Sequence, residues 1–207
     1  MRRVDIREYK QEIRTRGRAL RAELDKEQRA VLDFKIANNV RKLYQYGPCK
    51  TVMIYVSTPI EINTVPIIQM AFADGKRVAV PRCIPGTRKM EFYYITSLDD
   101  LEPGSFSVME PKDDMPMLTD FDKCLMIMPG IQFDTNGYRI GYGKGYYDRY
   151  MAKYTGFSAG LCYDWELRRH LCHGRFDRPV SAVVTDSHIR TCKLPKPTIR
   201  KETDYNG

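Results

Sequence analysis

A glycine-rich loop near residue 140 carries the strongest chemical signal in this sequence. Residues 128–150 read MPGIQFDTNGYRIGYGKGYYDRY, in which four glycines are interspersed with Arg139 and Lys144 and are followed by Asp148. Closely spaced glycines let backbone N–H groups approach an anion, and a helix beginning near Gly145 adds its positive end. Two cations for phosphate oxygens and a carboxylate for magnesium are the parts of a nucleotide site. The loop therefore predicts phosphate binding.

The same loop admits a plainer interpretation. No Ser or Thr follows Lys144, so the loop is not a Walker A motif, and the Rossmann spacing Gly-x-Gly-x-x-Gly is absent. As a glycine pattern alone, it is also compatible with a tight surface turn. The embedded cations and the carboxylate favour the nucleotide site.

Two further features could supply ligand contacts. Lys10 and Arg14 stand four residues apart on an expected helix, so they project from one face and could hold a polyphosphate from two sides. A solvated helix face is the alternative. Glu61 follows an expected buried strand, and the carboxyl edge of an α/β sheet is where ligands bind. Its alternative is a loop carboxylate in water.

The elements that must position these residues alternate between helix and strand. Periodicity and turn residues predict strands at 51–57, 77–81, 90–95, 124–128, 157–163 and 180–185, and helices at 6–24, 31–43, 62–73, 146–154 and 165–171. This alternation predicts an α/β fold with a mainly parallel sheet and helices on its faces.

We expect the whole chain, residues 1–207, to form one domain. A basic amino-terminal helix is expected at about residues 3–28. Residues 99–121 are rich in Pro, Asp and Met and predict an irregular surface excursion. The tail from about residue 193 to 207 contains prolines and is expected to be loosely held.

Composition excludes several classes of protein. With 207 residues, 43% of them hydrophobic, the chain can bury a core, but its longest apolar runs are far below the roughly 18 to 20 residues of a membrane helix. The start, MRRVDIREYK, has no apolar stretch after its basic residues and is not expected to be a secretory signal. Six cysteines stand without any Cys-x-x-Cys pair, which indicates reduced thiols and a cytoplasmic location.

The net charge of +8 is concentrated at the two ends of the chain. Residues 1–30 hold ten Lys or Arg against six acids, and residues 187–207 hold five against two. Basic ends suit nucleic acid, but they suit a small polyanion such as a nucleotide equally well, and solvated surface charge is the simplest interpretation. The tyrosines cluster in the glycine loop, away from the basic ends, which argues against nucleic acid.

Taken together, these motifs resemble the 5-formyltetrahydrofolate cyclo-ligase family, also called methenyltetrahydrofolate synthetases. The resemblance rests on GYRIGYGKGYYDRY after MPGIQFD, on Lys10-x-x-x-Arg14, on residues 57–61 and on the late strand ending at Asp186, and it covers roughly residues 6–187. It implies conversion of 5-formyltetrahydrofolate to 5,10-methenyltetrahydrofolate with ATP and Mg²⁺, releasing ADP and phosphate. It also implies a three-layer α/β/α fold similar to that of ribose-5-phosphate isomerase and CoA transferases.

The resemblance assigns residues position by position. The expected ATP contacts are Lys10, Arg14, Arg139, Ile140, Gly141, Tyr142, Gly143, Lys144, Gly145, Tyr146 and Tyr147. The expected folate contacts are Val56, Glu61, Tyr142, Gly143, Lys144, Gly145 and Tyr146, and the expected magnesium ligands are Asp148 and Asp186. Two departures limit the assignment: Phe176-Asp177 stands where the family often has His-Asp, and Asp186 stands where many relatives have Glu.

The expected chemistry needs positioning and charge stabilisation rather than an enzyme nucleophile. Lys144 and Arg139 are the expected catalytic residues, because they would neutralise charge on the transferred phosphoryl group. A basic nucleic-acid-binding protein and a sugar-phosphate isomerase or CoA transferase of similar fold are the alternatives. The expected partners are the two small-molecule substrates, with neither nucleic acid nor membrane; the sequence does not reveal the oligomeric state, and a monomer is our working expectation.

Overall fold

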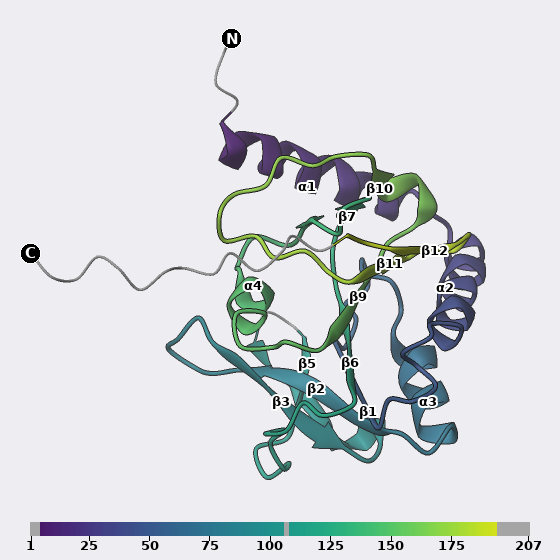
Figure 1. The fold of residues 1–207 in the computed structure, drawn as a ribbon, viewed down its shortest axis with the longest axis vertical. Coiled ribbons are helices and arrows are strands. Elements are labelled where there is room, and N and C mark those ends of the chain that lie inside the picture. Colours follow the sequence, from purple (N-terminus) through teal and green to yellow (C-terminus); the bar gives the residue numbers. More distant parts are fainter. Residues whose placement is uncertain (1–4, 106–107, 194–207) are drawn as a thin grey trace, which may run out of the picture.

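The computed structural model describes residues 5–105 and 108–193, and a seven-stranded sheet runs through its centre (Figure 1). The strand order is β12-β11-β9-β6-β1-β2-β3. The strands are β1 (Thr51–Ile54), β2 (Arg77–Cys83), β3 (Met90–Ile95), β6 (Cys124–Met128), β9 (Phe157–Leu161), β11 (Ala182–Val184) and β12 (Ile189–Thr191). All pairings among the inner strands are parallel, and the edge strands β3 and β12 are antiparallel to their neighbours. The predicted α/β class with a mainly parallel sheet is confirmed.

Alternate residues of each inner strand face two different cores. Val52 and Ile54 of β1 belong to one cluster, together with buried residues of α2 (Lys26–Arg41) and α3 (Val65–Ala73). Met53 points the other way and packs in a second cluster near α4 (Tyr146–Tyr150). Because side chains alternate across a strand, fully apolar strands are what a sheet covered on both faces requires. Figure 1 shows α2 and α3 on one side of the sheet and α4 on the other.

Two small sheets and two short 3₁₀ turns complete the described chain. The hairpin β4 (Leu101–Pro103) and β5 (Met109–Pro111) lies in the segment predicted to be irregular. A three-stranded sheet joins β7 (Gln132–Asp134), β8 (Arg139–Ile140) and β10 (Leu167–Arg168). The 3₁₀ turns are η1 (Leu98–Asp100) and η3 (Asp164–Glu166).

Three predicted helices differ from those observed. The basic amino-terminal helix is not continuous over residues 3–28: α1 (Ile6–Ala22) ends first, and Asp25 begins α2 by accepting the Gln28 N–H at 2.7 Å. The predicted helix at residues 165–171 is wrong, because this segment forms η3 and then β10, which pairs with β7. The helix predicted at 146–154 ends at Tyr150.

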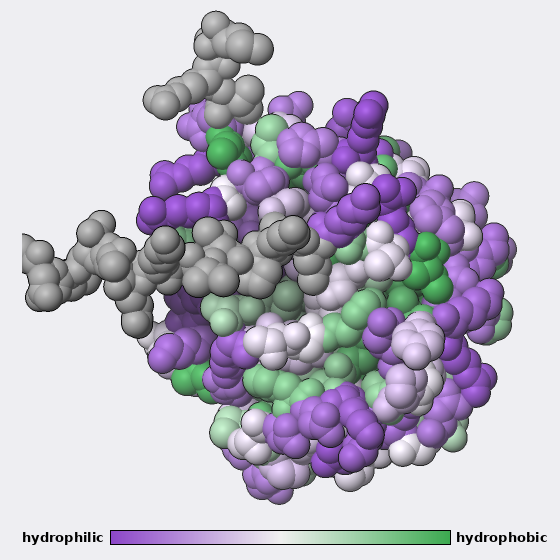
Figure 2. All heavy atoms as spheres, in the orientation of Figure 1, coloured by the Kyte–Doolittle hydropathy of each residue, from purple (hydrophilic) through white to green (hydrophobic). Residues whose placement is uncertain are grey.

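Figure 2 shows one face of the molecule coloured by hydropathy. Hydrophilic side chains cover the α1 end of this face, and hydrophobic ones gather toward its centre, over the strands. Within residues 5–105 and 108–193, no helix combines the length and the apolar character that crossing a membrane requires. The tail that was predicted to be loosely held begins at about residue 193, and residues 194–207 lie outside the described part of the chain.

Candidate active site

A cavity of about 1050 Å³ opens at the carboxyl ends of the central strands. Tyr55 and Val56 follow β1, Cys83 ends β2 and Pro129 follows β6, and all four line the cavity. One face of α1 and residues 139–149 of the glycine loop form further walls, together with parts of β3 and β5 and the segment at Phe176 and Asp177. The predicted site residues found on its walls are Lys10, Arg14, Val56, Glu61, Arg139, Ile140, Gly141, Tyr142, Gly143, Lys144, Gly145, Tyr146, Tyr147 and Asp148.

The glycine loop reaches α4 through two left-handed residues. Gly143 has φ 95°, and Gly145, directly before α4, has φ 71°. These backbone conformations cost side-chain-bearing residues free energy that glycine does not lose. The sequence of the loop therefore allows a tight turn that presents its backbone to the cavity.

Helix α1 contributes a row of cations to the opposite wall. Arg7, Lys10, Arg14 and Arg18 all line the cavity, at spacings of three and four residues that keep them on one helix face. Arg14 Nε donates to the carbonyl of Gly141 at 2.8 Å. Burial, followed by the charge of Arg18, lowers the pKa of Arg14. This crowding of positive charge would be relieved by a bound polyanion.

Arg139 and Asp148 form an ion pair within the loop wall. Arg139 Nη2 lies 2.9 Å from Asp148 Oδ1, and the Arg139 residue is only 8% exposed. Its Nε has no hydrogen-bond partner in the described part of the chain. A buried guanidinium with an unused donor is suited to take an additional acceptor, such as a phosphate oxygen.

The two predicted metal ligands are not brought to the same wall. Asp148 lines the cavity, whereas Asp186 does not and instead accepts the Asp164 N–H at 2.8 Å. Asp186 follows β11, which β9 separates from β6 in the sheet. With strands about 4.8 Å apart, the end of β11 is about 10 Å to the side of the end of β6. Asp186 follows a strand, as predicted, but it is not among the residues that line this cavity.

Asp177 is another carboxylate of the cavity wall near Asp148. Asp177 lines the cavity and its carboxylate accepts a hydrogen bond from Lys10 Nζ. The next residue, Arg178, donates its backbone N–H to Asp148 Oδ1 at 3.5 Å, so the two carboxylates lie on neighbouring segments. No role was predicted for Asp177 from the sequence.

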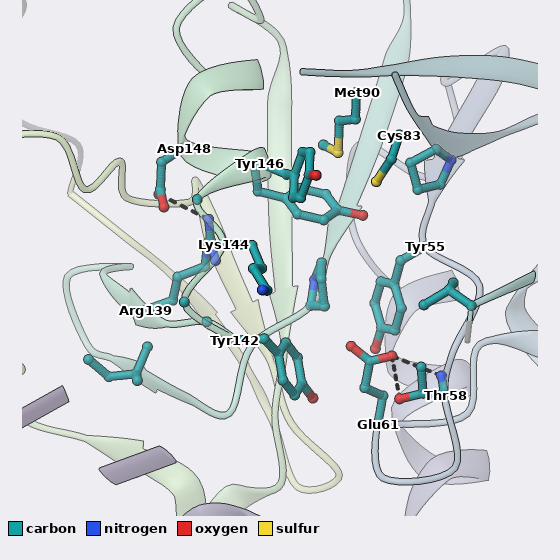
Figure 3. A pocket seen from close by; sticks show the side chains of 18 of the residues that line it. Tyr55, Thr58, Glu61, Cys83, Met90, Arg139, Tyr142, Lys144, Tyr146 and Asp148 are labelled. Atoms are coloured by element: carbon teal, nitrogen blue, oxygen red, sulfur yellow. Dashed lines mark hydrogen bonds and ion pairs between the residues drawn. The ribbon is translucent and has the colours of Figure 1, made fainter. Parts of the chain in front are cut away.

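The far end of the cavity combines one carboxylate with aromatic walls (Figure 3). Glu61 Oε2 accepts from the backbone N–H of Thr58 at 2.8 Å and from its hydroxyl at 2.9 Å. Figure 3 shows the other carboxylate oxygen of Glu61 on the side of Tyr55 and Tyr142, and Lys144 with Arg139 across the cavity. Burial and then the charge of Glu61 raise the pKa of the Tyr142 hydroxyl, so it remains a protonated donor.

The cavity thus joins a cationic loop end to an acceptor end lined with aromatic rings. The sequence model of the 5-formyltetrahydrofolate cyclo-ligase family matches residues 6–186. The chain belongs to this family. The 5-formyltetrahydrofolate cyclo-ligase of Mus musculus is 32% identical over 154 residues, covering 69% of this chain and 71% of the relative, and that of Escherichia coli K12 is 29% identical over 182 residues, covering 86% and 98%.

Solved structures agree with this family assignment. The NMR structure of the 5,10-methenyltetrahydrofolate synthetase of Aquifex aeolicus aligns with a TM-score of 0.79 at 26% identity, covering 95% of this chain and 99% of that chain. A 5,10-methenyltetrahydrofolate synthetase of Mycoplasma pneumoniae has the same fold, with a TM-score of 0.69 at 20% identity over 86% of this chain and 98% of that chain. The resemblance found in the sequence motifs of this cyclo-ligase family member is confirmed.

Several wall residues of this family member were missed in the sequence. Arg7 and Arg18 continue the helical spacing of Lys10 and Arg14, so the periodicity of α1 could have revealed them. Glu110 and Cys83 had no such signal. Glu110 lies in the segment predicted to be irregular, and Cys83 lies beyond the strand predicted at 77–81. The Cys83 N–H donates to Glu110 Oε1 at 3.2 Å. Burial, and then the Glu110 carboxylate, raises the pKa of the Cys83 thiol to about 11, so the thiol is neutral at pH 7.

Proposed function

We propose that this protein converts 5-formyltetrahydrofolate to 5,10-methenyltetrahydrofolate, with consumption of ATP and release of ADP and phosphate. The observation that carries the proposal is the single cavity that joins a glycine loop with cations to a carboxylate surrounded by tyrosines, in a chain of this family. The cationic end fits a polyphosphate and the acceptor end fits the N–H groups of a pterin ring. Both substrates would then meet within one site.

The proposed reaction has two steps that balance in atoms and charge. The formyl oxygen of the substrate attacks the γ-phosphorus of ATP, and ADP leaves. Nitrogen N10 then attacks the formyl carbon and gives up its proton, which closes the five-membered ring. The former formyl oxygen departs as part of inorganic phosphate, which carries the proton away. Phosphorylation is needed because an amide oxygen is a poor leaving group. No protein nucleophile takes part in either step.

The protein's contribution would be to position the reactants and to stabilise charge. We assign Lys10, Arg14 and the backbone of residues 139–147 to the polyphosphate, because all of them line the same cavity. Lys144 and Arg139 would neutralise the charge that moves with the phosphoryl group. The unpartnered Nε of Arg139 supports this role, since it gives the guanidinium a further donor for a phosphate oxygen once the side chain turns toward the cavity.

The carboxylates that face the loop fit a magnesium site of the kind used with nucleotides. Within residues 5–105 and 108–193, no three His, Cys, Asp or Glu side chains gather to hold a metal. Magnesium bound to ATP needs only one or two carboxylates, with phosphate oxygens and water as the remaining ligands. We propose that Asp148 and Asp177 hold it, while Arg139 and Lys10, their present partners, turn toward the phosphates. When bound, the ion would neutralise phosphate charge.

At the other end, Glu61 would accept hydrogen bonds from the pterin, and Thr58 would fix its orientation. Val56 and the rings of Tyr142 and Tyr146 would form the walls around the folate. Tyr142 is held from behind by Arg18, whose guanidinium carbon lies 5.6 Å from the ring centre. We propose that residues 142–146 contact both substrates, because this part of the loop lies between the two ends.

The finer expectations about context also belong to this proposal. The six free cysteines support a reducing, cytoplasmic environment. Two cores on the two faces of one sheet support a single domain with the three-layer arrangement of ribose-5-phosphate isomerase and CoA transferases. Four of the six basic residues of α1 face the cavity. This favours a small polyanion over nucleic acid and, with the family assignment, over the isomerase and transferase activities.

The test is a spectrophotometric assay with purified protein, 5-formyltetrahydrofolate and MgATP. The conjugated methenyl product absorbs in the near ultraviolet. We expect the absorbance to rise only when protein, folate and MgATP are all present. No rise with folded protein would refute the proposal.

A further inference from the structure

Arg21, in the last turn of α1, carries a guanidinium that is fully enclosed by the protein. The residue is 2% exposed, and Glu166, its partner, is 1% exposed. The pair is bidentate: Arg21 Nε lies 2.7 Å from Glu166 Oε1, and Nη2 lies 2.7 Å from Oε2. This parallel geometry fixes the plane of the guanidinium.

The remaining donors of this guanidinium reach three segments that carry the acceptor end of the cavity. Nη1 donates to the carbonyl of Ile60 and to the hydroxyl of Tyr142, both at 3.3 Å. Nη2 donates to the carbonyl of Gly130, just beyond β6, at 2.8 Å. Ile60 directly precedes Glu61 in the chain, and Tyr142 is in the glycine loop. One side chain therefore connects three walls that are distant in sequence.

Stability alone does not account for a charged pair at this position. Replacing a buried ion pair by apolar residues is often neutral or stabilising, because both charges must be removed from water. Arg21 is also absent from the cavity lining, so it is not placed to touch a ligand itself. Its contacts are instead concentrated on the backbone next to Glu61 and on the hydroxyl of Tyr142.

We infer that Arg21 is a positioning residue for folate: paired with Glu166, it holds Tyr142 and the loop of Glu61 at the spacing that fits the pterin ring. This inference rests on the proposed function. At the cationic loop end, Arg139 pairs with Asp148. The guanidinium of Arg21 instead holds the backbone next to Glu61 and the hydroxyl of Tyr142. Of these contacts only Tyr142 is also assigned to ATP, so Arg21 should affect the folate much more strongly than ATP.

The test separates the two substrates in the full-length enzyme. Arg21→Lys keeps the positive charge but replaces the planar guanidinium, with its several N–H donors, by one ammonium group. That group cannot reach Glu166, Ile60 and Tyr142 together. We expect the KM for 5-formyltetrahydrofolate to rise about tenfold, since displacements near 1 Å have large effects, and the KM for ATP to change less than about twofold. When Arg21→Lys is combined with Tyr142→Phe, the change in the folate KM should differ from the sum of the two single-variant free-energy changes.

Two controls distinguish positioning from loss of stability. Val40→Ala shortens a fully buried side chain of α2 that does not line the cavity, so it should lower stability without changing either KM. If Arg21→Lys does not fold, Arg21→Met combined with Glu166→Met removes both charges and should fold, yet raise the folate KM in the same way. In folded variants, an unchanged folate KM or equal changes in both KM values would overturn the inference alone. A wild-type protein without turnover would overturn the proposed function and the inference with it.

Discussion

Replacing Glu61 by Gln should damage folate recognition far more than the loss of one charge suggests. The hydrogen bonds from Thr58 to Glu61 Oε2 require an acceptor at that position, and the backbone N–H of Thr58 cannot be changed. In Glu61→Gln the amide oxygen must therefore stay beside Thr58, and the NH₂ group must turn toward the cavity. An acceptor for the pterin N–H groups becomes a donor that opposes them.

The size of the effect follows from this reversal. A hydrogen bond to a charged group contributes about 1.5–3 kcal/mol, and the opposed donors lose their water without gaining a partner. We expect a total loss of about 3 kcal/mol, which lowers kcat/KM for 5-formyltetrahydrofolate about 100-fold. The KM for ATP should stay within about twofold of the wild-type value, because Glu61 lies across the cavity from the cations.

The absorbance assay, run with each substrate varied in turn, measures this difference. Thr58→Val is the matched control: it removes one of the two hydrogen bonds to Glu61 and leaves the carboxylate charged, so a loss of about three- to tenfold is expected. Glu61→Gln with kcat/KM for folate within about threefold of wild type would refute the assignment of Glu61 to the pterin.

Five further variants test the phosphoryl-transfer step, the metal ligands and the packing of buried hydroxyls. Lys144→Met should lower kcat at least about 100-fold, because it removes charge stabilisation of the phosphoryl group. Circular dichroism should show that the fold is retained. An unchanged kcat would exclude Lys144 from the mechanism. Asp148→Asn should raise the Mg²⁺ concentration for half-maximal activity about tenfold, whereas Asp186→Asn should leave that concentration unchanged. A rise caused by Asp186→Asn and not by Asp148→Asn would make Asp186 the ligand. Tyr150→Phe should raise the free energy of unfolding by about 1 kcal/mol, because the buried Tyr150 hydroxyl has no hydrogen-bond partner in the described structure. Tyr154→Phe should lower the free energy of unfolding by about 1 kcal/mol, because the Tyr154 hydroxyl lies 2.9 Å from the carbonyl of Cys124. Urea unfolding measures both changes, and the same sign for the two variants would contradict this prediction.

The parts of the site that could be predicted are local in sequence. The glycine loop holds its four glycines, two cations and carboxylate within twelve residues, 137–148, so its pattern was visible without any knowledge of the fold. Glu61 could be placed because it follows a recognisable strand. The alternation of strands and helices likewise sufficed for the α/β class, since parallel strands need crossover connections.

The parts that could not be predicted depend on distant pairings. Lys10 meets Asp177 across 167 positions, and Arg21 meets Glu166 across 145. Strand order is a property of the same kind, so the sequence could not show that Asp148 lines the cavity while Asp186 does not. The segment after residue 164 has a helical pattern, but pairing of Leu167 and Arg168 with β7 overrides it. By contrast, the break in the first helix had a local sign: Asp25 with Gln28 three residues later begins a new helix.

The central claim, transfer of the γ-phosphoryl group to the formyl oxygen, is tested most directly by isotope labelling. The enzyme is supplied with MgATP and 5-formyltetrahydrofolate that carries ¹⁸O in the formyl group, and the phosphate released is analysed by mass spectrometry. The account predicts one ¹⁸O atom in each phosphate, matched in amount to the methenyl product. Methenyl product formed with unlabelled phosphate would contradict it, because the formyl oxygen would then have left by a route that bypasses phosphorylation.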